Sequence, residues 1–465
     1  MHVGSVAVFE GPAPAYGDLV RLLVGKLPLV PRYRQRVRAV PLHLGRPVWA
    51  DDEHFQILYH VRHTAVPAPG GAEQLRNLAG RVFAQRLDPA KPLWEMWLVE
   101  GLEGGRWALI SKVHHCMVDG VAGMDLATVL VDSTTGDKGP AAPAAWTPRP
   151  GPSPIRLVTG GLRDAVLEPL QQLARVPDLV RNLPSRGQVL DFGRGLVAGV
   201  RRLVDPSART LNGSVGPHRR WEWAQANLDE VRQVRKAFGG TVNDVVLAAV
   251  TRGYRDLLAA RGELTDGAVV RSLVPVSVRA PHERGVPTNR VSAVLVNLPV
   301  GEPDPVARLA RLREQMDDLK RNRQAVSAQA LTGLAGFAAP TLLAMGTRLT
   351  FRYPQSLMQT VTTNVPGPRF PMHMLGRRLV EVFPYVPIAY NLRISIGIFS
   401  YLDRLDFGIT ADFDAVPDVG VLSQGIRDGF AELVDRAKLA AAVRTRSNAA
   451  VARRSPARSS AAAGR

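Results

Sequence analysis

The chain has 465 residues, of which 46% are apolar and 22% charged, so it is long enough for two to four globular domains with a sizeable core. Its single cysteine, Cys116, excludes an intramolecular disulfide and fits a reducing compartment such as the cytoplasm. Residues 148–220 hold 12 arginines and 5 acidic residues, and residues 444–465 hold six arginines and no acid, so 13 of the 18 net positive charges lie there. Such patches suit an anionic partner, whereas the alternative is a solvated, Arg-rich linker and tail.

Residues 1–138 form the first predicted unit, which mixes strands and helices. Apolar spacing predicts strands over 3–9 and 107–114 and helices over 17–26 and 72–85. The N-terminal residues lack a basic region followed by a long apolar run, so no secretory signal is predicted.

Residues 139–220 form a linker region between the two units. Six prolines fall within 139–154, which predicts an extended segment with little regular structure. Leu, Val and Arg then recur at helical spacing over 155–204. These basic amphipathic helices could lie on a membrane surface or pack across two domains.

Residues 221–443 form the second predicted unit, and residues 444–465 a disordered Arg-rich tail. Helices are predicted over 228–238 and 241–259, and strands over 269–274, 291–298, 360–363, 394–400 and 405–411. The second helix opens with Thr241 as a possible N-cap and Asp244 in its first turn. The apolar stretch 330–346 is interrupted by Pro340 and is shorter than the ~20 residues of a membrane span, which favours a buried or interfacial helix.

The sequence HHCMVDG, from His114 to Gly120, follows directly on a predicted strand. Histidine has the near-neutral pKa that removal of a proton from a hydroxyl requires, and the end of a strand lets its ring project into a cavity. Asp119 and Gly120 permit a tight turn that bends the carboxylate back toward the histidines or an arginine. The alternatives are two buried core histidines or half of a metal site.

Further motifs accompany HHxxxDG in order along nearly the whole chain. They are Pro92-Leu93-Trp94, Leu211-Asn212-Gly213, Gly216-Pro217-His218-Arg219-Arg220, Asn243-Asp244, Pro275-Val276-Ser277-Val278-Arg279, Asn289-Arg290, Leu298-Pro299, Asn364-Val365-Pro366-Gly367-Pro368, Ser400-Tyr401, Asp406-Phe407-Gly408 and Ala411-Asp412. Together they resemble the bacterial wax ester synthase/diacylglycerol acyltransferase family, which belongs to the coenzyme-A-dependent acyltransferase superfamily. Two departures are visible: the family's LSxxDxxF segment is missing before Met1, and Leu402-Asp403 stands where the family has a glycine. The first departure implies a start assigned too late or a missing element at the tunnel mouth.

The resemblance implies a mixed α/β fold of two chloramphenicol-acetyltransferase-like subdomains with a tunnel between them. It also implies an enzyme that moves an acyl group from acyl-CoA, a co-substrate, to diacylglycerol, giving triacylglycerol, or to a long-chain alcohol, giving a wax ester. No resident cofactor, metal or nucleic-acid partner is expected, and the enzyme would contact the inner membrane or lipid inclusions from the cytoplasm. A same-fold acyltransferase with another alcohol or amine acceptor, and a catalytically dead membrane-binding protein, remain alternatives.

Residue roles follow from the same resemblance. His115 would be the general base in a direct transfer without an acyl-enzyme, with His114 beside it. Asp119 would hold the loop and Gly120 its turn. Support from the second half would come from Asn243 and Asp244, and Thr363 or Asn364 could donate to the oxyanion, a contribution typically worth ~10²–10³ in rate.

Two alternative interpretations concern Cys116 as a nucleophile and His60 with His63 as metal ligands. Neighbouring residues on an extended chain point to opposite faces, so Cys116 and His115 should not converge as a nucleophile–base pair. His60 and His63 have the spacing of a metal-ligand pair, but no acidic or cysteine partner nearby completes a set, which favours two ordinary polar strand residues.

Overall fold

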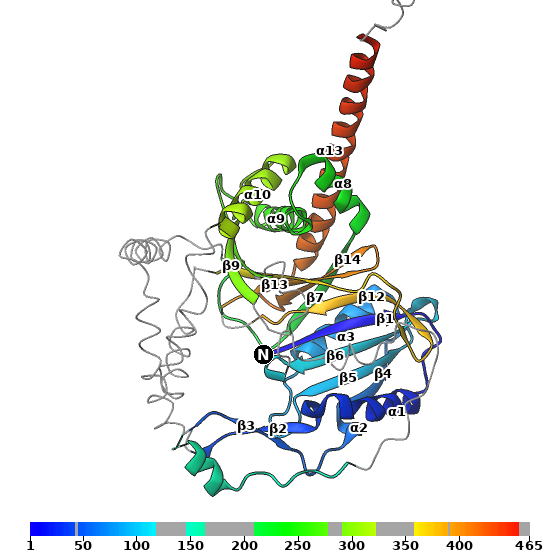
Figure 1. The fold of residues 1–465 in the computed structure, drawn as a ribbon, viewed down its shortest axis with the longest axis vertical. Helices are drawn as coiled ribbons and strands as arrows, with labels where there is room; N and C mark the ends of the chain where they lie inside the picture. Colours follow the sequence, from blue (N-terminus) through cyan, green and yellow to red (C-terminus); the bar gives the residue numbers. More distant parts are fainter. Residues whose placement is uncertain are drawn as a thin grey trace, which may run out of the picture.

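Two six-stranded sheets organise the protein in a computed structural model that describes residues 1–41, 45–117, 146–161, 163, 209–277, 291–321, 358–388 and 391–454. One face of the second sheet is covered by a layer of helices, and the first sheet lies on its other side (Figure 1). The described residues thus form a mixed α/β fold, as the sequence predicted.

The first sheet carries the HH pair at the end of a central strand. Its strand order is β11 (His373–Met374), β12 (Arg377–Tyr385), β1 (His2–Phe9), β6 (Trp107–His114), β5 (Trp94–Glu100) and β4 (Val61–Ala65). All neighbours in it are antiparallel except β4 and β5. The helices of this half are α1 (Tyr16–Lys26), α2 (Ile57–His60) and α3 (Ala72–Ala84), with the short 3₁₀ turns η1 (Leu27–Leu29), η2 (Pro31–Arg34), η4 (Glu103–Gly105) and η5 (His115–Met117), and a small hairpin of β2 (Gln35–Arg38) and β3 (Val48–Asp51).

The second sheet is built from the later part of the chain. Its order is β7 (Arg219–Asn227), β14 (Arg404–Asp412), β13 (Ile394–Tyr401), β10 (Thr360–Pro366), β8 (Val270–Ser277) and β9 (Val291–Leu298). Strand β10 runs parallel to both its neighbours, β13 and β8. The helices α8 (Leu228–Phe238), α9 (Val242–Ala260), α10 (Pro305–Arg321) and α13 (Val419–Arg454) cover its outer face (Figure 1).

Strand β12 belongs by sequence to the second half but pairs with β1 in the first sheet. The chain leaves the second sheet after β10, forms β11 and β12 in the first sheet, and returns to the second sheet at β13. The two sheets are therefore not each drawn from one continuous half of the chain, which the boundaries expected from the sequence did not indicate.

Two glycines let β12 cross close over the second sheet. Gly397 and Gly408 are paired across β13 and β14, and both face Pro384 of β12. A Cβ at Gly408 would overlap the carbonyl oxygen of Pro384, so any larger residue would push the sheets apart. This contact explains the glycine of the Asp406-Phe407-Gly408 motif.

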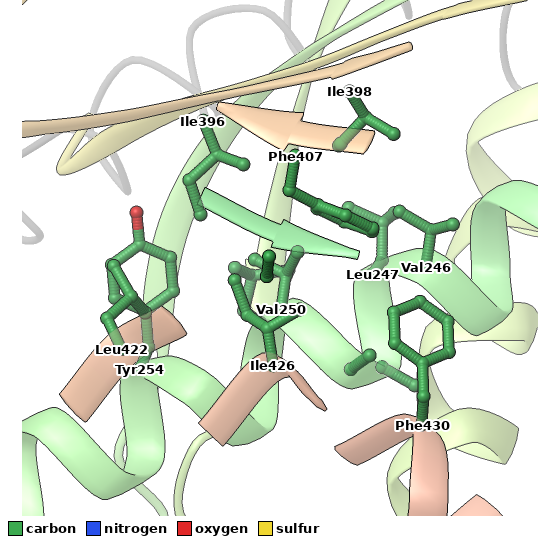
Figure 2. Close-up of a cluster of buried hydrophobic side chains, with 14 of the residues drawn as sticks. Val246, Leu247, Val250, Tyr254, Ile396, Ile398, Phe407, Leu422, Ile426 and Phe430 are labelled. Carbon is green, nitrogen blue, oxygen red and sulfur yellow. The ribbon is translucent and has the colours of Figure 1, made fainter. Parts of the chain in front are cut away.

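The largest apolar core lies between the second sheet and its helices. Ile396, Ile398 and Phe407 of the sheet face Val250 of α9 and Phe430 of α13 (Figure 2). Alternate residues of β13 point to this core because a strand places successive side chains on opposite faces.

Helix α9 begins as its sequence predicts. The Thr241 side chain accepts from the N–H of Asp244 at 3.3 Å, and the Asp244 carboxylate accepts from the N–H of Thr241 at 2.7 Å, which forms a capping box. The capping box fixes where α9 starts, directly before Asn243.

The tail differs from its expected disorder. Helix α13 continues to Arg454, so residues 444–454 are helical, and the remaining 455–465 lie outside the described residues. This part of the tail is rich in alanine and arginine, both strong helix formers, and it extends a helix that has already formed against the sheet. No helix in the described ranges combines the length and apolar character needed to cross a membrane, and 330–346 lies outside those ranges.

Candidate active site

His114 ends β6 at the rim of a large cavity. Its ring is half-buried, and Nδ1 accepts from the backbone N–H of Cys116 at 3.3 Å, while Nε2 lies 3.1 Å from the terminal amine of Met1. Burial, the amine and His115 all lower the pKa of His114, so its ring is neutral at pH 7. A neutral imidazole is the form that can accept a proton.

His115 begins the 3₁₀ turn η5, and its side chain is exposed. Its backbone N–H donates to the carbonyl oxygen of Met1 at 3.0 Å, which ties the turn to the neighbouring strand β1. Within the described residues, its ring makes no hydrogen bond. Asp119 and Gly120, the other two predicted members of the motif, lie outside the described residues.

The predicted residues of the second half divide into two groups. Asn243 and Asn364 meet, since Asn364 Nδ2 donates to Asn243 Oδ1 at 3.4 Å. Asp244 is buried and serves its own helix through the capping box. It therefore supports α9 and does not itself extend from the helix toward the first sheet.

Thr363 and Asn364 point to opposite faces of the second sheet. Asn364 pairs in register with Ile398, which faces the helices, and its amide meets α9. Thr363 pairs with Gly397, which faces β12 of the first sheet. In-register residues of paired strands share a face, so of the two oxyanion candidates only Thr363 points between the sheets.

A cavity of about 1200 Å³ lies between the two halves next to His114. Its walls are residues 1–2, several residues between Arg81 and Pro89 at the end of α3, the segment Val215–Arg219, and Tyr385 with Pro387 and Ile388 after β12. Among the described residues predicted for the site, His114 lines this cavity, whereas His115, Asn243, Asp244, Thr363 and Asn364 do not. Sequence reasoning singled out 216–220 as a motif but missed that its residues 216–219 line the cavity, because no local pattern signals a contact across 100 residues.

Cys116 contacts His114 rather than His115: its Sγ lies 3.0 Å from Nδ1 of His114. Although Cys116 is exposed, partial desolvation raises the pKa of its thiol, which disfavours the thiolate that a nucleophile requires. His115 and Cys116 lie in the 3₁₀ turn η5, not on the extended chain from which the expectation was drawn.

The other histidine pair is split between two elements. His60 ends α2, is buried, and stacks on Trp94 at 4.6 Å with Nδ1 2.8 Å from its carbonyl oxygen, so it is not the strand residue that was expected. His63 lies on β4 and pairs with Glu100 at 3.3 Å. In the described part of the chain, no cluster of His, Cys, Asp and Glu is arranged to hold a metal ion.

The two stacked sheets with a strand exchanged between them, and histidines at the end of a central strand, define the class of two-sheet α/β folds to which condensation domains also belong. The first condensation domain of the CDA synthetase shares this fold, with a TM-score of 0.53 at 16% identity over 94% of this chain and 91% of that domain. A likeness at this identity concerns the fold alone.

Residues 1–246 match the wax ester synthase/diacylglycerol acyltransferase catalytic domain, and residues 288–434 match the C-terminal domain of the same family. The chain therefore belongs to the wax ester synthase/diacylglycerol acyltransferase family, which confirms the resemblance drawn from its motifs. It is an acyltransferase.

Two relatives show how far the similarity extends. The chain is 38% identical to the "Probable diacyglycerol O-acyltransferase tgs1" of Mycobacterium tuberculosis (strain ATCC 25618 / H37Rv) over 93% of this chain and 91% of that protein. It is 25% identical to the wax ester synthase/diacylglycerol acyltransferase from Marinobacter aquaeolei VT8, with a TM-score of 0.66 over 94% of this chain and 95% of that one.

Proposed function

We propose that this chain transfers an acyl group from acyl-CoA to diacylglycerol, giving triacylglycerol and free CoA. The observation that carries the proposal is the 38% identity, over 93% of the chain, to a protein named as a diacylglycerol O-acyltransferase. The position of the HH pair at the end of β6, beside a large cavity, supports it.

In the proposed reaction His115 is the general base. It removes the proton of the acceptor hydroxyl as the oxygen attacks the thioester carbonyl carbon, so a C–O bond forms. The tetrahedral intermediate then breaks its C–S bond, and the CoA sulfur leaves with the proton that His115 has held. No acyl-enzyme forms in this scheme.

The remaining predicted residues take supporting roles in the proposal. His114 packs beside His115, with its neutral ring held by Cys116 N–H. Asp119 and Gly120 hold the turn after the histidines. Thr363 donates to the oxyanion, a role that its position on the face between the sheets supports. Asn243 and Asn364 brace the start of α9 against β10, with Asp244 as part of the cap.

The activity test is a panel of acyl-CoA donors crossed with diacylglycerol, hexadecanol and chloramphenicol as acceptors. Triacylglycerol formation that exceeds the other products supports the proposal. A wax ester as the main product favours the second candidate, a long-chain-alcohol acyltransferase, which the Marinobacter relative's name includes. No ester from any acceptor at enzyme concentrations of micromolar order contradicts both.

We also propose that the enzyme contacts an anionic lipid surface, at the inner membrane or at lipid inclusions. The helix α13 extends well beyond the rest of the fold (Figure 1), and Leu439 and Val443 on it are 63% and 66% exposed beside Lys438 and Arg444. Each basic residue near an anionic membrane contributes ~1 kcal/mol, and the attraction decreases with salt.

Liposome flotation tests this contact. Deleting 444–465 should weaken binding to anionic vesicles, and more so at low salt, while binding to neutral vesicles should not change. Equal flotation of the full-length and shortened proteins at low and high salt would show that the tail has no role at the membrane.

A further inference from the structure

We infer that the wall of the cavity formed by Arg81, Arg86 and Arg219 binds the phosphate groups of the CoA donor. This inference rests on the proposed function and deepens it, since it assigns one end of the cavity to the donor. We call these three residues the arginine wall.

Among the described residues that line the cavity, every charged side chain is basic. The lining includes the three arginines together with His2, His114 and His218, and no aspartate or glutamate of the described ranges. Within the described residues, Arg81 and Arg86 form no ion pair, and both side chains are exposed. Two unneutralised guanidinium groups on the lining of a cavity attract a polyanion.

Two close contacts bring Arg81 and Arg219 to one side of the cavity. Gly80 of α3 approaches the backbone of β7, and a Cβ there would lie 2.9 Å from the carbonyl oxygen of Arg219. Arg76 of the same helix pairs with Glu222 of β7 at 2.6 Å. Helix α3 and strand β7 are thus fixed side by side, which places Arg81 next to Arg219 although they are more than 130 residues apart in sequence.

Arg219 is held in place before any ligand binds. Its Nη1 donates to the carbonyl oxygens of Gly216 at 2.6 Å and His218 at 2.7 Å, and its guanidinium also bonds to the buried hydroxyl of Tyr385. A guanidinium has five N–H donors in a fixed fork, and since Nη1 of Arg219 donates to these two carbonyls, Nε and Nη2 carry the donors that remain for a phosphate. A pre-positioned arginine loses less entropy on binding than a free one.

The segment from Leu211 to Gly216, part of the motif, anchors this part of the wall. Asn212 Nδ2 donates to the carbonyl oxygens of Met358 and Asn391, and the N–H of Gly216 donates to the Asp412 carboxylate at 2.6 Å. Gly213 has a φ of 151°, and a Cβ there would overlap the guanidinium of Arg393. The motif therefore fixes the loop that leads into Arg219, a structural role consistent with its recognition in the sequence.

The rest of the cavity suits the uncharged part of the same donor. Phe83, Leu87, Leu93 and Ile388 line it with apolar surface, and His114 also lines it. A donor with its phosphates on the arginine wall would lay its pantetheine arm along this surface, with the thioester directed toward the histidines. Charge-assisted hydrogen bonds from arginine to phosphate are among the strongest hydrogen bonds in proteins. Because they lie away from the reacting atoms, the arginine wall should set the affinity for the donor rather than the rate of the chemical step.

The experiment compares three donors with different phosphate content: palmitoyl-CoA, palmitoyl-3′-dephospho-CoA and palmitoyl-N-acetylcysteamine, which has no phosphate. We expect the double variant Arg81→Gln/Arg86→Gln to raise KM for palmitoyl-CoA about tenfold or more, with kcat nearly unchanged and with no change in KM for the phosphate-free donor. The increase should be smaller for the dephosphorylated donor. Arg219→Lys, which keeps the charge but loses the fork, should raise KM for palmitoyl-CoA as well.

Arg220→Gln is the matched control. It follows Arg219 directly, but its guanidinium lies over the ring of Phe413 at 4.0 Å, and its Nε donates to the Phe413 carbonyl, away from the cavity. We expect this variant to keep the wild-type KM for every donor. An equal rise in KM for all three donors, or no rise for palmitoyl-CoA, in the double variant would overturn the inference.

Titration calorimetry with CoA itself separates this inference from the proposed function, because CoA binds without turnover. Arginine-dependent CoA binding in a protein that makes no ester would contradict the proposed function alone, whereas normal turnover with CoA binding unaffected by Arg81→Gln/Arg86→Gln would contradict the inference alone. Lipid phosphates present the same chemistry as those of CoA. If the double variant lost flotation with phosphatidylglycerol vesicles and kept its CoA affinity, the wall would bind lipid headgroups, and the inference would be wrong.

Discussion

The two sheets differ in what surrounds their buried polar groups. The second sheet pairs short hydroxyls across its strands and helix, such as Ser272 with Thr362 at 2.8 Å, beneath a wide aliphatic core. The first sheet buries a charge: Lys112 of β6 is 1% exposed and bonds Glu95 at 3.1 Å and the carbonyl oxygens at the end of α3. Lys112 lies two residues before His114. Its bonds to the carbonyl oxygens of Val82 and Gln85 fix the last turn of α3, which carries Arg81.

Stability and chemistry are thus separated in space. The second sheet with its helices supplies most of the apolar burial, while the cavity-side end of the first sheet carries His114 and His115. Substitutions in the two regions should therefore affect different measurements.

The largest expected effect is on rate. His115→Ala should lower kcat by ~10²–10⁴, because loss of a general base alone typically costs this much. Its side chain is exposed, so the melting temperature should stay near that of the wild type. His114→Ala, the matched control on the neighbouring residue, should lose less activity. Turnover of the His115 variant above about a tenth of the wild-type value would show that His115 is not the base.

The next effect is on stability and comes from the second sheet. Phe407 is fully buried and meets Phe430 of α13 edge to face, with ring centroids 5.7 Å apart (Figure 2). Phe407→Ala should lower the free energy of unfolding by about 3–5 kcal/mol because it leaves a cavity in the core. Denaturant titration measures the loss, and kcat per folded molecule should be unchanged.

Phe370→Ala is the control of the same chemistry at an exposed site, since Phe370 is 51% exposed. It should change the free energy of unfolding by less than about 1 kcal/mol. Equal losses from both variants would mean that burial in the second sheet does not dominate stability.

Local sequence patterns predicted most of the elements that hold the candidate site, and the structure shows why. The strand over 107–114 and the helix over 228–238 have the predicted bounds, because their apolar periodicity and flanking residues are local signals. Thr241 was predicted as the cap of α9 for the same reason.

Features that depend on distant partners could not be predicted in this way. The pairing of β12 with β1 joins residues at least 370 apart, and the sequence of neither strand indicates which strand it pairs with. The arginine wall depends on Gly80 approaching β7, which also has no local signature. The motifs identified residues of the candidate site, whereas only the folded structure shows which of these residues lie together in space.

The junction between the two sheets should respond to pH. Asp406 is fully buried, and its carboxylate accepts from Val382 N–H of β12 at 3.0 Å and from Gln225 of β7 at 2.9 Å. Burial raises the pKa of Asp406 to about 6, above its value in the unfolded chain, despite these hydrogen bonds. The folded state thus binds more protons between about pH 4 and pH 6, and the contribution of Asp406 to the free energy of unfolding decreases as pH rises through this window.

The change across that window is on the order of 3 kcal/mol, since each pKa unit corresponds to 1.36 kcal/mol. Asp406→Asn removes this titration, and Gln225 can rotate its amide to accept from the new Nδ2. The melting temperature of the wild type minus that of the variant should rise as pH falls from 7 to 4.5. A difference that stays constant with pH would show that Asp406 is not protonated in this range.

The smallest expected effect is at Cys116, which lies beside the reacting groups and yet should not react. Its Sγ is 3.0 Å from Nδ1 of His114, a geometry that could suggest a nucleophile and its base. Burial raises the pKa of the thiol, however, and the Nδ1 atom already accepts the N–H of Cys116 itself. Cys116→Ala should therefore keep kcat within about twofold of the wild type, because the backbone donor to His114 remains and no covalent step is lost. Intact mass spectrometry after incubation of the wild type with acyl-CoA alone gives the independent readout. A stable acyl adduct, absent from the alanine variant, would show that the enzyme transfers the acyl group in two steps through Cys116.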